Sequence, residues 1–318
     1  MTTSNLLIAA IGVPLAMLLA CVVSGIRERM PPLLALAPIP ALLAALCADD
    51  TPLMLGNARF ALSFVMDKPG AMLLLVAAIL WIAAGVYAAT ELRGAVNAGR
   101  FVVCWLMTLT GCVGVFLAAD MVGFYFLLAV LSVGASGLVL QGGTVEALRA
   151  SAVYLGLALI AEAFLLAGLV MLAMVTPDGS LLIRDAAAAI PTSPWRDLTL
   201  VLLVVGLGMK AGLVPLHFWM PLAYGAAPIP AAAVMSGAVV KASALALIRF
   251  LPFEVGLPDF GLPLAAIGLC GAFYGVAIGI TQSRPKLVLA YSSVSQMGFL
   301  VAVIGMGLAT GDAGTPLT

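Results

Sequence analysis

Charged residues are scarce in this chain of 318 residues. Asp, Glu, Lys and Arg together make up 9% of the sequence, whereas soluble domains carry about 25%. The 14 basic and 14 acidic side chains balance to a net charge of zero, so the sequence predicts no basic surface that could attract nucleic acid. These shortages exclude a soluble enzyme, a nucleic-acid-binding protein and a disordered chain.

Residues that hold metals or redox centres are also few. The chain has one histidine and five cysteines, and the cysteines lie in or beside apolar runs without a CxxC motif. Small buried thiols are the ordinary interpretation of such cysteines. We therefore expect no metal site, no iron–sulfur site and no cofactor in this chain. The sequence also lacks a Gly-rich phosphate loop and a Ser/His/Asp set, so redox chemistry or hydrolysis by this chain is not expected.

Apolar residues, in contrast, are abundant: 64% of the chain is hydrophobic and the mean hydropathy is +1.22. A membrane-spanning helix needs about 20 apolar residues, and the runs of that length predict an all-α, polytopic membrane bundle of about ten helices. The expected spans are 5–25, 32–48, 69–89, 101–119, 121–141, 148–174, 198–219, 229–250, 262–281 and 286–309. The second span is short, and Pro38 and Pro40 interrupt it. The first is expected to be a retained span, because the basic residues follow it instead of preceding it.

The distribution of basic residues predicts the orientation of these helices. Loops after odd-numbered spans contain seven Lys and Arg residues: Arg27, Arg29, Arg93, Arg100, Arg149, Arg284 and Lys286. Loops after even-numbered spans contain five: Arg59, Lys68, Arg184, Arg196 and Arg249. We therefore expect the odd loops in the cytoplasm, the N-terminus outside, and the chain in the cell inner (cytoplasmic) membrane. The segment 180–197 is too short to span and is expected to be an interfacial helix on the outer face or a solvated loop.

Three charged residues lie deep inside the predicted spans, away from their ends: Glu162 in the sixth, Lys210 in the seventh and Lys241 in the eighth. A charge at the centre of a lone membrane helix costs about 2.5–3.5 kcal/mol, and such residues commonly mark ion or proton pathways. We therefore expect a proton or ion pathway through the two lysines, with Glu162 as a further member. A static ion pair that only fixes helix packing is the alternative.

The residues after Lys210 predict a break in the seventh helix. Pro215 lacks a backbone donor and clashes with the preceding turn, and Gly212 lies just before it, so the helix should break around 211–215. A broken membrane helix exposes backbone carbonyls and admits water, and transporters use such breaks to build ion sites. His217, two residues beyond the proline, suits a proton relay. A packed polar residue is the alternative interpretation of this histidine.

These features occur together in the stretch 206–250, GLGMKAGLVPLHFWMPLAYGAAPIPAAAVMSGAVVKASALALIRF. A second notable stretch is TQSRPKLVLAYSSVSQMGFL at 281–300. With these two motifs, most of the sequence resembles a family of antiporter-like proton-channel subunits. That family is found in respiratory complex I, membrane-bound hydrogenases, multisubunit sodium/proton antiporters and a class of inorganic-carbon accumulation complexes.

The resemblance implies a fold with two inverted five-helix repeats, each containing one broken helix. It divides the chain into N-terminal transmembrane helices (1–119), one complete antiporter-like repeat with a broken seventh helix (120–250), and the start of a second, incomplete repeat (251–318). Because the sequence ends at Thr318, we expect it to form one complete half-channel and not to carry protons alone. Either another chain supplies the rest, or the transport role has partly decayed.

The resemblance also implies roles for individual residues. Lys210 corresponds to the lysine on the family's broken seventh helix, and Lys241 to the lysine on the eighth helix that leads toward the membrane centre. His217 matches the histidine of the PLH motif just beyond the break. Asp67 is similar to the acidic residue that commonly opens the third helix.

Three positions depart from the family pattern. Val130 stands where the fifth helix usually carries the glutamate that partners Lys210, while Leu222 and Tyr224 replace an aspartate and a second histidine. Lys210 then needs another anion, and Glu162 is the acidic residue deepest in a predicted span. We expect its carboxylate within about 6 Å of the ammonium group, where opposite charges affect each other's protonation. The alternative is that Glu162 faces a neighbouring subunit or stays neutral in an apolar pocket.

The resulting functional expectation is a membrane-arm subunit of a complex I-like proton-translocating assembly. Its expected partners are other membrane-arm subunits, including a second antiporter-like chain, together with protons and the lipid bilayer. One alternative is a subunit of a cation/proton antiporter or an inorganic-carbon accumulation complex. The other is a structural subunit that positions such an arm without pumping.

Overall fold

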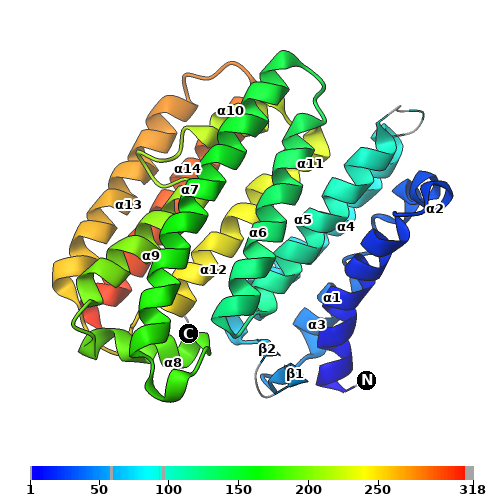
Figure 1. The fold of residues 1–318 in the computed structure, drawn as a ribbon. Helices are drawn as coiled ribbons and strands as arrows, with labels where there is room; N and C mark the ends of the chain where they lie inside the picture. The colour runs from blue at the N-terminus through cyan, green and yellow to red at the C-terminus, as the bar shows by residue number, and fades with distance from the viewer. Residues whose placement is uncertain (1, 58–59, 93, 95–96, 312–318) are drawn as a thin grey trace. The chain divides into compact units, whose positions relative to one another are not determined.

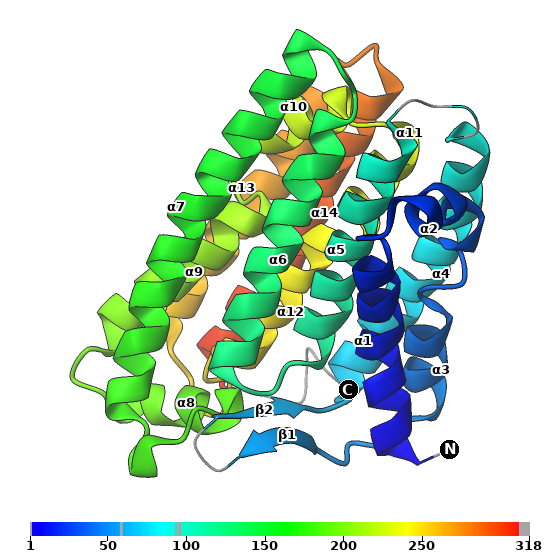
Figure 2. The same cartoon turned by 45° about the vertical axis from the view of Figure 1, so that its right-hand side comes forward.

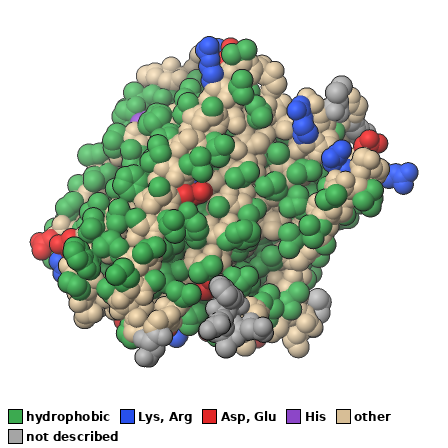
Figure 3. Space-filling view, viewed as in Figure 1, with side chains coloured by type: hydrophobic (Ala, Val, Ile, Leu, Met, Phe, Trp, Pro, Cys, Tyr) green, Lys and Arg blue, Asp and Glu red, His purple; other side chains and the backbone are tan. Residues whose placement is uncertain are grey.

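The computed structural model describes residues 2–57, 60–92, 94 and 97–311, and the described chain is almost entirely helical (Figure 1). Eight of its helices are long and apolar enough to cross a membrane, so the protein is a multi-pass membrane protein. They are Thr3–Ala20, Lys68–Glu91, Ala98–Leu117, Met121–Leu140, Val145–Val175, Ile229–Phe250, Pro258–Gly279 and Pro285–Thr310. Hydrophobic side chains dominate the face seen in Figure 3, as helices in contact with lipid require.

The other two predicted spans, 32–48 and 198–219, are interrupted helices. The first divides into η1 (Pro31–Leu33) and α3 (Ile39–Cys47), because prolines stand at the beginning of both pieces. The second divides at the break described below. Two residues used to predict the orientation, Arg59 and Arg93, lie outside the described residues, as does Thr318.

The chain folds as two compact units: Met1–Leu155 with Ala226–Val239, and Gly156–Gly225 with Val240–Thr318. Unit 1 contains α1 (Thr3–Ala20), α2 (Ser24–Arg29), η1, α3, β1 (Leu53–Asn57), β2 (Phe60–Phe64), α4 (Lys68–Glu91), α5 (Ala98–Leu117), α6 (Met121–Leu140), the beginning of α7 (Val145–Val175), α11 (Ile229–Val234) and the π-helical turn η4 (Met235–Val239). The segments 1–119, 120–250 and 251–318 describe membrane repeats instead of compact units, and they remain predictions.

The two strands of unit 1 form an antiparallel hairpin that the sequence analysis did not predict (Figure 2). Asp120 fixes this hairpin to the beginning of α6. Its two carboxylate oxygens accept hydrogen bonds from the Ser63 N–H at 2.7 Å and the Gly123 N–H at 2.6 Å. Asp67 caps α4 in a similar way, accepting from the Gly70 N–H at 2.9 Å, which confirms its predicted place at the start of that helix.

Unit 2 contains the remainder of α7, η2 (Pro177–Gly179), α8 (Ile183–Ala189), η3 (Ile190–Thr192), α9 (Arg196–Ala211), α10 (Trp219–Ala226), α12 (Val240–Phe250), α13 (Pro258–Gly279) and α14 (Pro285–Thr310). Of the two alternatives for 180–197, the structure forms the short helix α8 followed by a 3-10 turn. Its position at the outer membrane face remains a prediction.

Helices α13 and α14 contact each other backbone to backbone. A Cβ atom at Gly275 would lie 2.6 Å from Ser295 N, and one at Gly298 would lie 2.7 Å from Gly268 O. Gly305 approaches α13 equally closely, at Gly261. Membrane helices associate mainly through such close packing of small residues, because lipid offers no hydrophobic driving force between them. Helices α13 and α14 therefore form a closely packed pair within unit 2.

Candidate functional site

Helix α9 ends at Ala211, inside the predicted seventh span. Gly212 follows in the left-handed conformation, with φ 72° and ψ 37°, which residues with a Cβ atom rarely adopt. The Val214–Pro215 peptide bond is cis, and the chain becomes helical again at Trp219. The predicted helix break at Gly212 and Pro215 is therefore confirmed.

Donors within the protein satisfy two of the carbonyl groups that the break releases. The Leu213 N–H donates to the carbonyl of Gly208 at 2.8 Å. The indole N–H of Trp219 donates to the carbonyl of Met209, also at 2.8 Å. Because an unpaired backbone group is costly at membrane depth, these bonds allow the helix to stop there without water at every open carbonyl.

Lys210 lies in the last turn of α9 and forms an ion pair with Glu162 of α7. Its Nζ atom lies 2.9 Å from Oε1, and the two side chains are 7% and 10% exposed. The other ion pairs of the described residues are at the surface. The predicted approach of Glu162 to Lys210 is confirmed. A buried pair of this kind is costly to break, because each partner would remain as an uncompensated charge.

The close approach of α9 to α7 explains how the two charged groups meet. A Cβ atom at Gly206 would lie 2.7 Å from Leu165 Cγ and 2.9 Å from the carbonyl oxygen of Ala161. Gly206 is four residues, or about one helical turn, before Lys210, and Ala161 directly precedes Glu162. The absence of a side chain at Gly206 therefore lets the two backbones come together where the ion pair forms.

The second predicted lysine, Lys241, is the second residue of α12 and follows the π-helical turn η4. Its Nζ atom lies 3.5 Å from Oε1 of Gln296 on α14, which is a long hydrogen bond. Gln296 in turn donates through Nε2 to the hydroxyl of Ser292 at 3.4 Å. The sequence analysis missed both α14 residues because it searched the spans for charges, although the stretch 281–300 contains them.

His217, in the segment between α9 and α10, lies beside two tyrosines. Its ring centroid is 4.9 Å from that of Tyr274 on α13 and 6.4 Å from that of Tyr291 on α14. Among the described atoms, its buried Nδ1 has no hydrogen-bond partner. The structure brings Lys210 and Glu162 together and places His217 in an aromatic cluster with Tyr274 and Tyr291. Within the part of the chain that the structure describes, no three His, Cys, Asp or Glu residues gather as metal ligands.

The departures from the family pattern also have structural consequences. Tyr224, at the position of the expected second histidine, is fully buried and packs edge to face against Trp219, with ring centroids 6.4 Å apart. Leu222 is 49% exposed. The segment after the break is therefore closed by aromatic packing where the family pattern would place further titratable groups.

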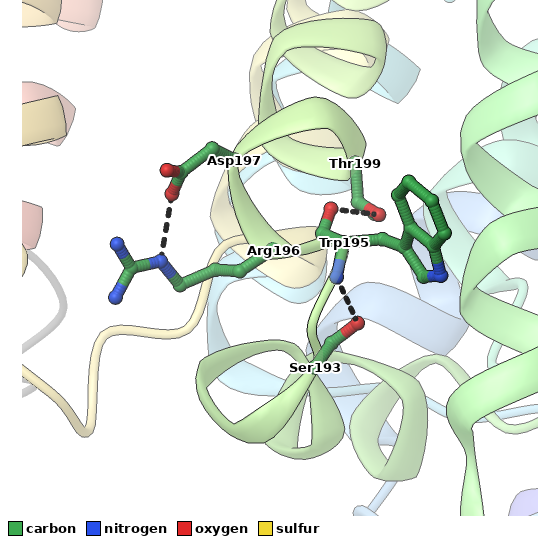
Figure 4. Close-up of polar contacts among 5 residues, drawn as sticks. All are labelled: Ser193, Trp195, Arg196, Asp197 and Thr199. Carbon is green, nitrogen blue, oxygen red and sulfur yellow. Dashed lines mark hydrogen bonds and ion pairs between the residues drawn. The ribbon is translucent and has the colours of Figure 1, made fainter.

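The beginning of α9 is fixed at the surface by local hydrogen bonds (Figure 4). The Ser193 hydroxyl accepts from the Trp195 N–H at 3.1 Å, and the Thr199 hydroxyl donates to the Trp195 carbonyl at 2.9 Å. Arg196 pairs with Asp197 at 2.8 Å, but exposed ion pairs contribute little to stability. The polar contacts that hold this end of α9 are therefore distinct from the buried pair at its other end.

Fold and site together define a polytopic helical membrane protein built around a broken helix that carries a buried, paired lysine. Residues 118–315 match the transmembrane family described as NADH:quinone oxidoreductase/Mrp antiporter. The chain therefore belongs to this family of antiporter-like membrane subunits.

Individual relatives come from two kinds of complex. The chain is 35% identical to NADH-quinone oxidoreductase subunit N of Desulforudis audaxviator, over 79% of this chain and 50% of the relative. It is 29% identical to a Na(+)/H(+) antiporter subunit of Alkalihalophilus pseudofirmus, over 82% of this chain and 53% of the relative. The fold is similar to that of a chain in the Mrp complex from Dietzia sp. DQ12-45-1b, with a TM-score of 0.82 and 22% identity, over 97% of this chain and 60% of that one. The chain thus spans about half the length of these curated relatives.

Proposed function

We propose that this chain is a membrane-arm subunit of a proton-translocating assembly and that it relays protons through Lys210 and Lys241. The observation that carries the proposal is the buried ion pair between Lys210 and Glu162 at the end of a broken helix. A group that accepts and releases protons inside a membrane needs an environment with two states, and we assign these states to a closed and an open form of the buried pair. While the pair is closed, the carboxylate stabilises the ammonium form. When the two groups separate, the apolar surroundings favour the neutral amine, and a proton is released.

Glu162 takes the role of proton-affinity partner in this proposal. Val130 cannot carry a charge, whereas Glu162 is within hydrogen-bonding distance of Lys210. The position of Lys210 in the last turn of α9 adds a second favourable interaction, because the negative end of the helix dipole stabilises a cation there. The lysine can therefore hold a proton at a depth where an isolated ammonium group would be costly.

The onward route runs from Lys241 to the surface of α14. Lys241 is half-buried, whereas Gln296 and Ser292 are exposed on the described chain. Exposed polar side chains in the middle of a membrane helix are expected to face protein or water instead of lipid. We propose that the polar side chains of Lys241, Gln296 and Ser292 continue into a partner polypeptide. The membrane arm in this proposal includes a second antiporter-like chain. The expected place of the complex is the cell inner membrane, with the N-terminus outside.

The first alternative is a subunit of a cation/proton antiporter or an inorganic-carbon accumulation complex. Its support is the similarity to the Na(+)/H(+) antiporter relative, which covers as much of this chain as the similarity to the oxidoreductase relative. The second alternative is a structural subunit, supported by Val130 at the position of the family's glutamate. In that case the ion pair would only fix α7 to α9.

Everted membrane vesicles from the source organism separate these three possibilities. Lys210→Met and Lys210→Arg should both assemble but abolish proton uptake through the complex, because methionine carries no proton and arginine does not release one. If NADH oxidation drives proton uptake with the unchanged protein but not with the Lys210 variants, the complex is a redox pump. If added sodium drives that uptake instead, the complex is an antiporter. Lys286→Met, which removes a lysine from the first turn of α14, is the matched control. Normal proton uptake in both Lys210 variants would leave the structural role.

A further inference from the structure

A second feature of the molecule lies near the N-terminus, directly after helix α1. The 18 residues of α1 rise about 27 Å at 1.5 Å per residue, close to the thickness of the hydrocarbon layer. We therefore expect the segment that follows, Cys21 to Leu33, where the hydrocarbon meets the lipid headgroups. It forms the short helix α2 and the turn η1.

This segment contains an open apolar groove of about 290 Å³. The groove is lined by Val23, Gly25, Ile26, Arg29, Met30 and Leu33. Met30 is buried at its base, whereas three of its apolar side chains are accessible: Val23 is 56% exposed, Ile26 44% and Leu33 43%. Val22, next to the groove, is 82% exposed. At the boundary of a bilayer such side chains are stable only in contact with an apolar group, so the groove calls for an apolar occupant.

One basic residue lines the same groove, and others lie close to it in the fold. Arg29 forms part of its wall, and Arg27 is on the same short helix. The Arg27 side chain extends over the first turn of α5, where a Cβ atom at Gly99 would lie 3.0 Å from its Nε, next to exposed Arg100. None of the ion pairs among the described residues involves these three arginines. Basic side chains and an acidic one lie near each other at the upper right of Figure 3. Helix α2 itself carries Glu28 between its two arginines.

We propose that this corner, Cys21 to Leu33 with Arg100, is a binding site for an anionic phospholipid of the bilayer. The acyl chain occupies the apolar groove, and the phosphate group is bound by the guanidinium group of Arg29, which lines the groove, while Arg27 on the same short helix adds positive charge nearby. Guanidinium groups match phosphate oxygens in geometry and charge. Basic residues at this depth attract anionic headgroups. The apolar groove beside them fits a molecule that carries both a phosphate and an alkyl chain. This site is separate from the lysine pair and does not depend on the proposed relay.

The site can be tested on the purified chain in neutral detergent. Dioleoyl-phosphatidylglycerol, dioleoyl-phosphatidylcholine and inorganic phosphate are titrated separately. The readouts are the melting temperature and the number of bound lipids in native mass spectra. Phosphatidylglycerol should raise the melting temperature and remain bound at low concentration, whereas the other two should do neither. Arg27→Gln combined with Arg29→Gln should raise the half-saturating concentration of phosphatidylglycerol about 30-fold, since each arginine near a lipid surface contributes about fivefold.

Two further variants separate the charge from the groove. Arg284→Gln combined with Lys286→Gln removes the same charge at the beginning of α14, which does not line the groove, and it should leave the titration unchanged. Ile26→Ser keeps every charge but should weaken phosphatidylglycerol binding. Equal binding of phosphatidylcholine, or an unchanged titration in the Arg27/Arg29 variant, would overturn the proposal. A response to inorganic phosphate alone would show an anion site without lipid, and it would overturn the proposal as well.

Discussion

The Nζ atom of Lys210 lies 2.9 Å from Oε1 of Glu162, and the two side chains are nearly enclosed by the protein. The pair connects the last turn of α9 to the middle of α7, next to the place where the α9 backbone opens. Each charge offsets the desolvation of the other, so neither group is stable alone in this environment. This mutual dependence can be measured by comparing the single variants with the double variant.

The first prediction concerns the stability of the pair. Glu162→Gln and Lys210→Met should each destabilise the protein by about 3–5 kcal/mol, because each leaves one buried charge without a partner. The double variant should recover most of that loss, since it leaves no charge behind. Unfolding in mixed detergent, followed by far-UV circular dichroism, gives the three values. Additive losses in the double variant would contradict a direct interaction between the two groups.

The second prediction concerns the second lysine. Lys241→Met should abolish proton uptake in vesicles as completely as Lys210→Met, while leaving stability nearly unchanged because Lys241 is only half-buried. Gln296→Leu should slow proton uptake without abolishing it, since the amide touches the ammonium group only through a long hydrogen bond. Gln282→Leu, between α13 and α14 and outside this polar line, is the control. Full activity of Lys241→Met would remove this residue from the route.

The third prediction concerns the hairpin of unit 1. Asp120→Ala removes two backbone hydrogen bonds, to Ser63 and Gly123, and should cost about 2–4 kcal/mol. Asp67→Ala removes one capping bond, to Gly70, and should cost about 1 kcal/mol. Thermal unfolding compares the two variants directly. Limited proteolysis should cleave near β1 and β2 in the Asp120 variant and spare them in the Asp67 variant.

The fourth prediction concerns the contact between α13 and α14. Gly268→Leu places a side chain against the backbone of Gly298 and Ala302, so it should destabilise the protein by about 1–3 kcal/mol or more. Gly156→Leu is the matched control in the same unit, because a Cβ atom there meets nothing within 4 Å. The control should stay within about 0.5 kcal/mol of the unchanged protein. Equal melting temperatures for the two variants would show that the helices are not held by close backbone packing.

The fifth prediction concerns the orientation in the membrane. Single cysteines at Asn97 and Thr192 are introduced into a chain whose own cysteines are replaced by serine, since Cys47 and Cys270 are exposed. An impermeant thiol reagent added to intact cells should label Thr192→Cys and not Asn97→Cys, because basic loops remain in the cytoplasm. The reverse pattern of labelling would place the N-terminus in the cytoplasm.

Much of this fold follows from local physical chemistry. Apolar runs predict most of the long helices because backbone groups in lipid must pair within their own segment. The break after Ala211 follows from Gly212 and Pro215, whose backbone preferences act within a single turn. The partner of Lys210 was predictable by elimination, since Glu162 is the acidic residue deepest in a span and a buried ammonium group requires an anion.

Other features depend on contacts between distant segments. The contact between Lys241 and Gln296 exists because α12 packs against α14, and nothing in either helix alone predicts it. His217 lies next to Tyr274 of α13, a contact that nothing in the sequence around the break predicts. The hairpin was missed because each strand has only five residues, which a search for spans of about 20 residues passes over.

The empty position at Gly206 has a wider consequence. The separation between the two charges at this site is set by a residue that carries no functional group, because any larger residue would push α9 away from Ala161 and Leu165. A larger residue at this position would separate Lys210 from Glu162, although neither ionisable residue is itself replaced. The strength of the electrostatic coupling between Lys210 and Glu162 therefore depends on a glycine. A survey of the acidic and basic residues alone would overlook a mutation at Gly206.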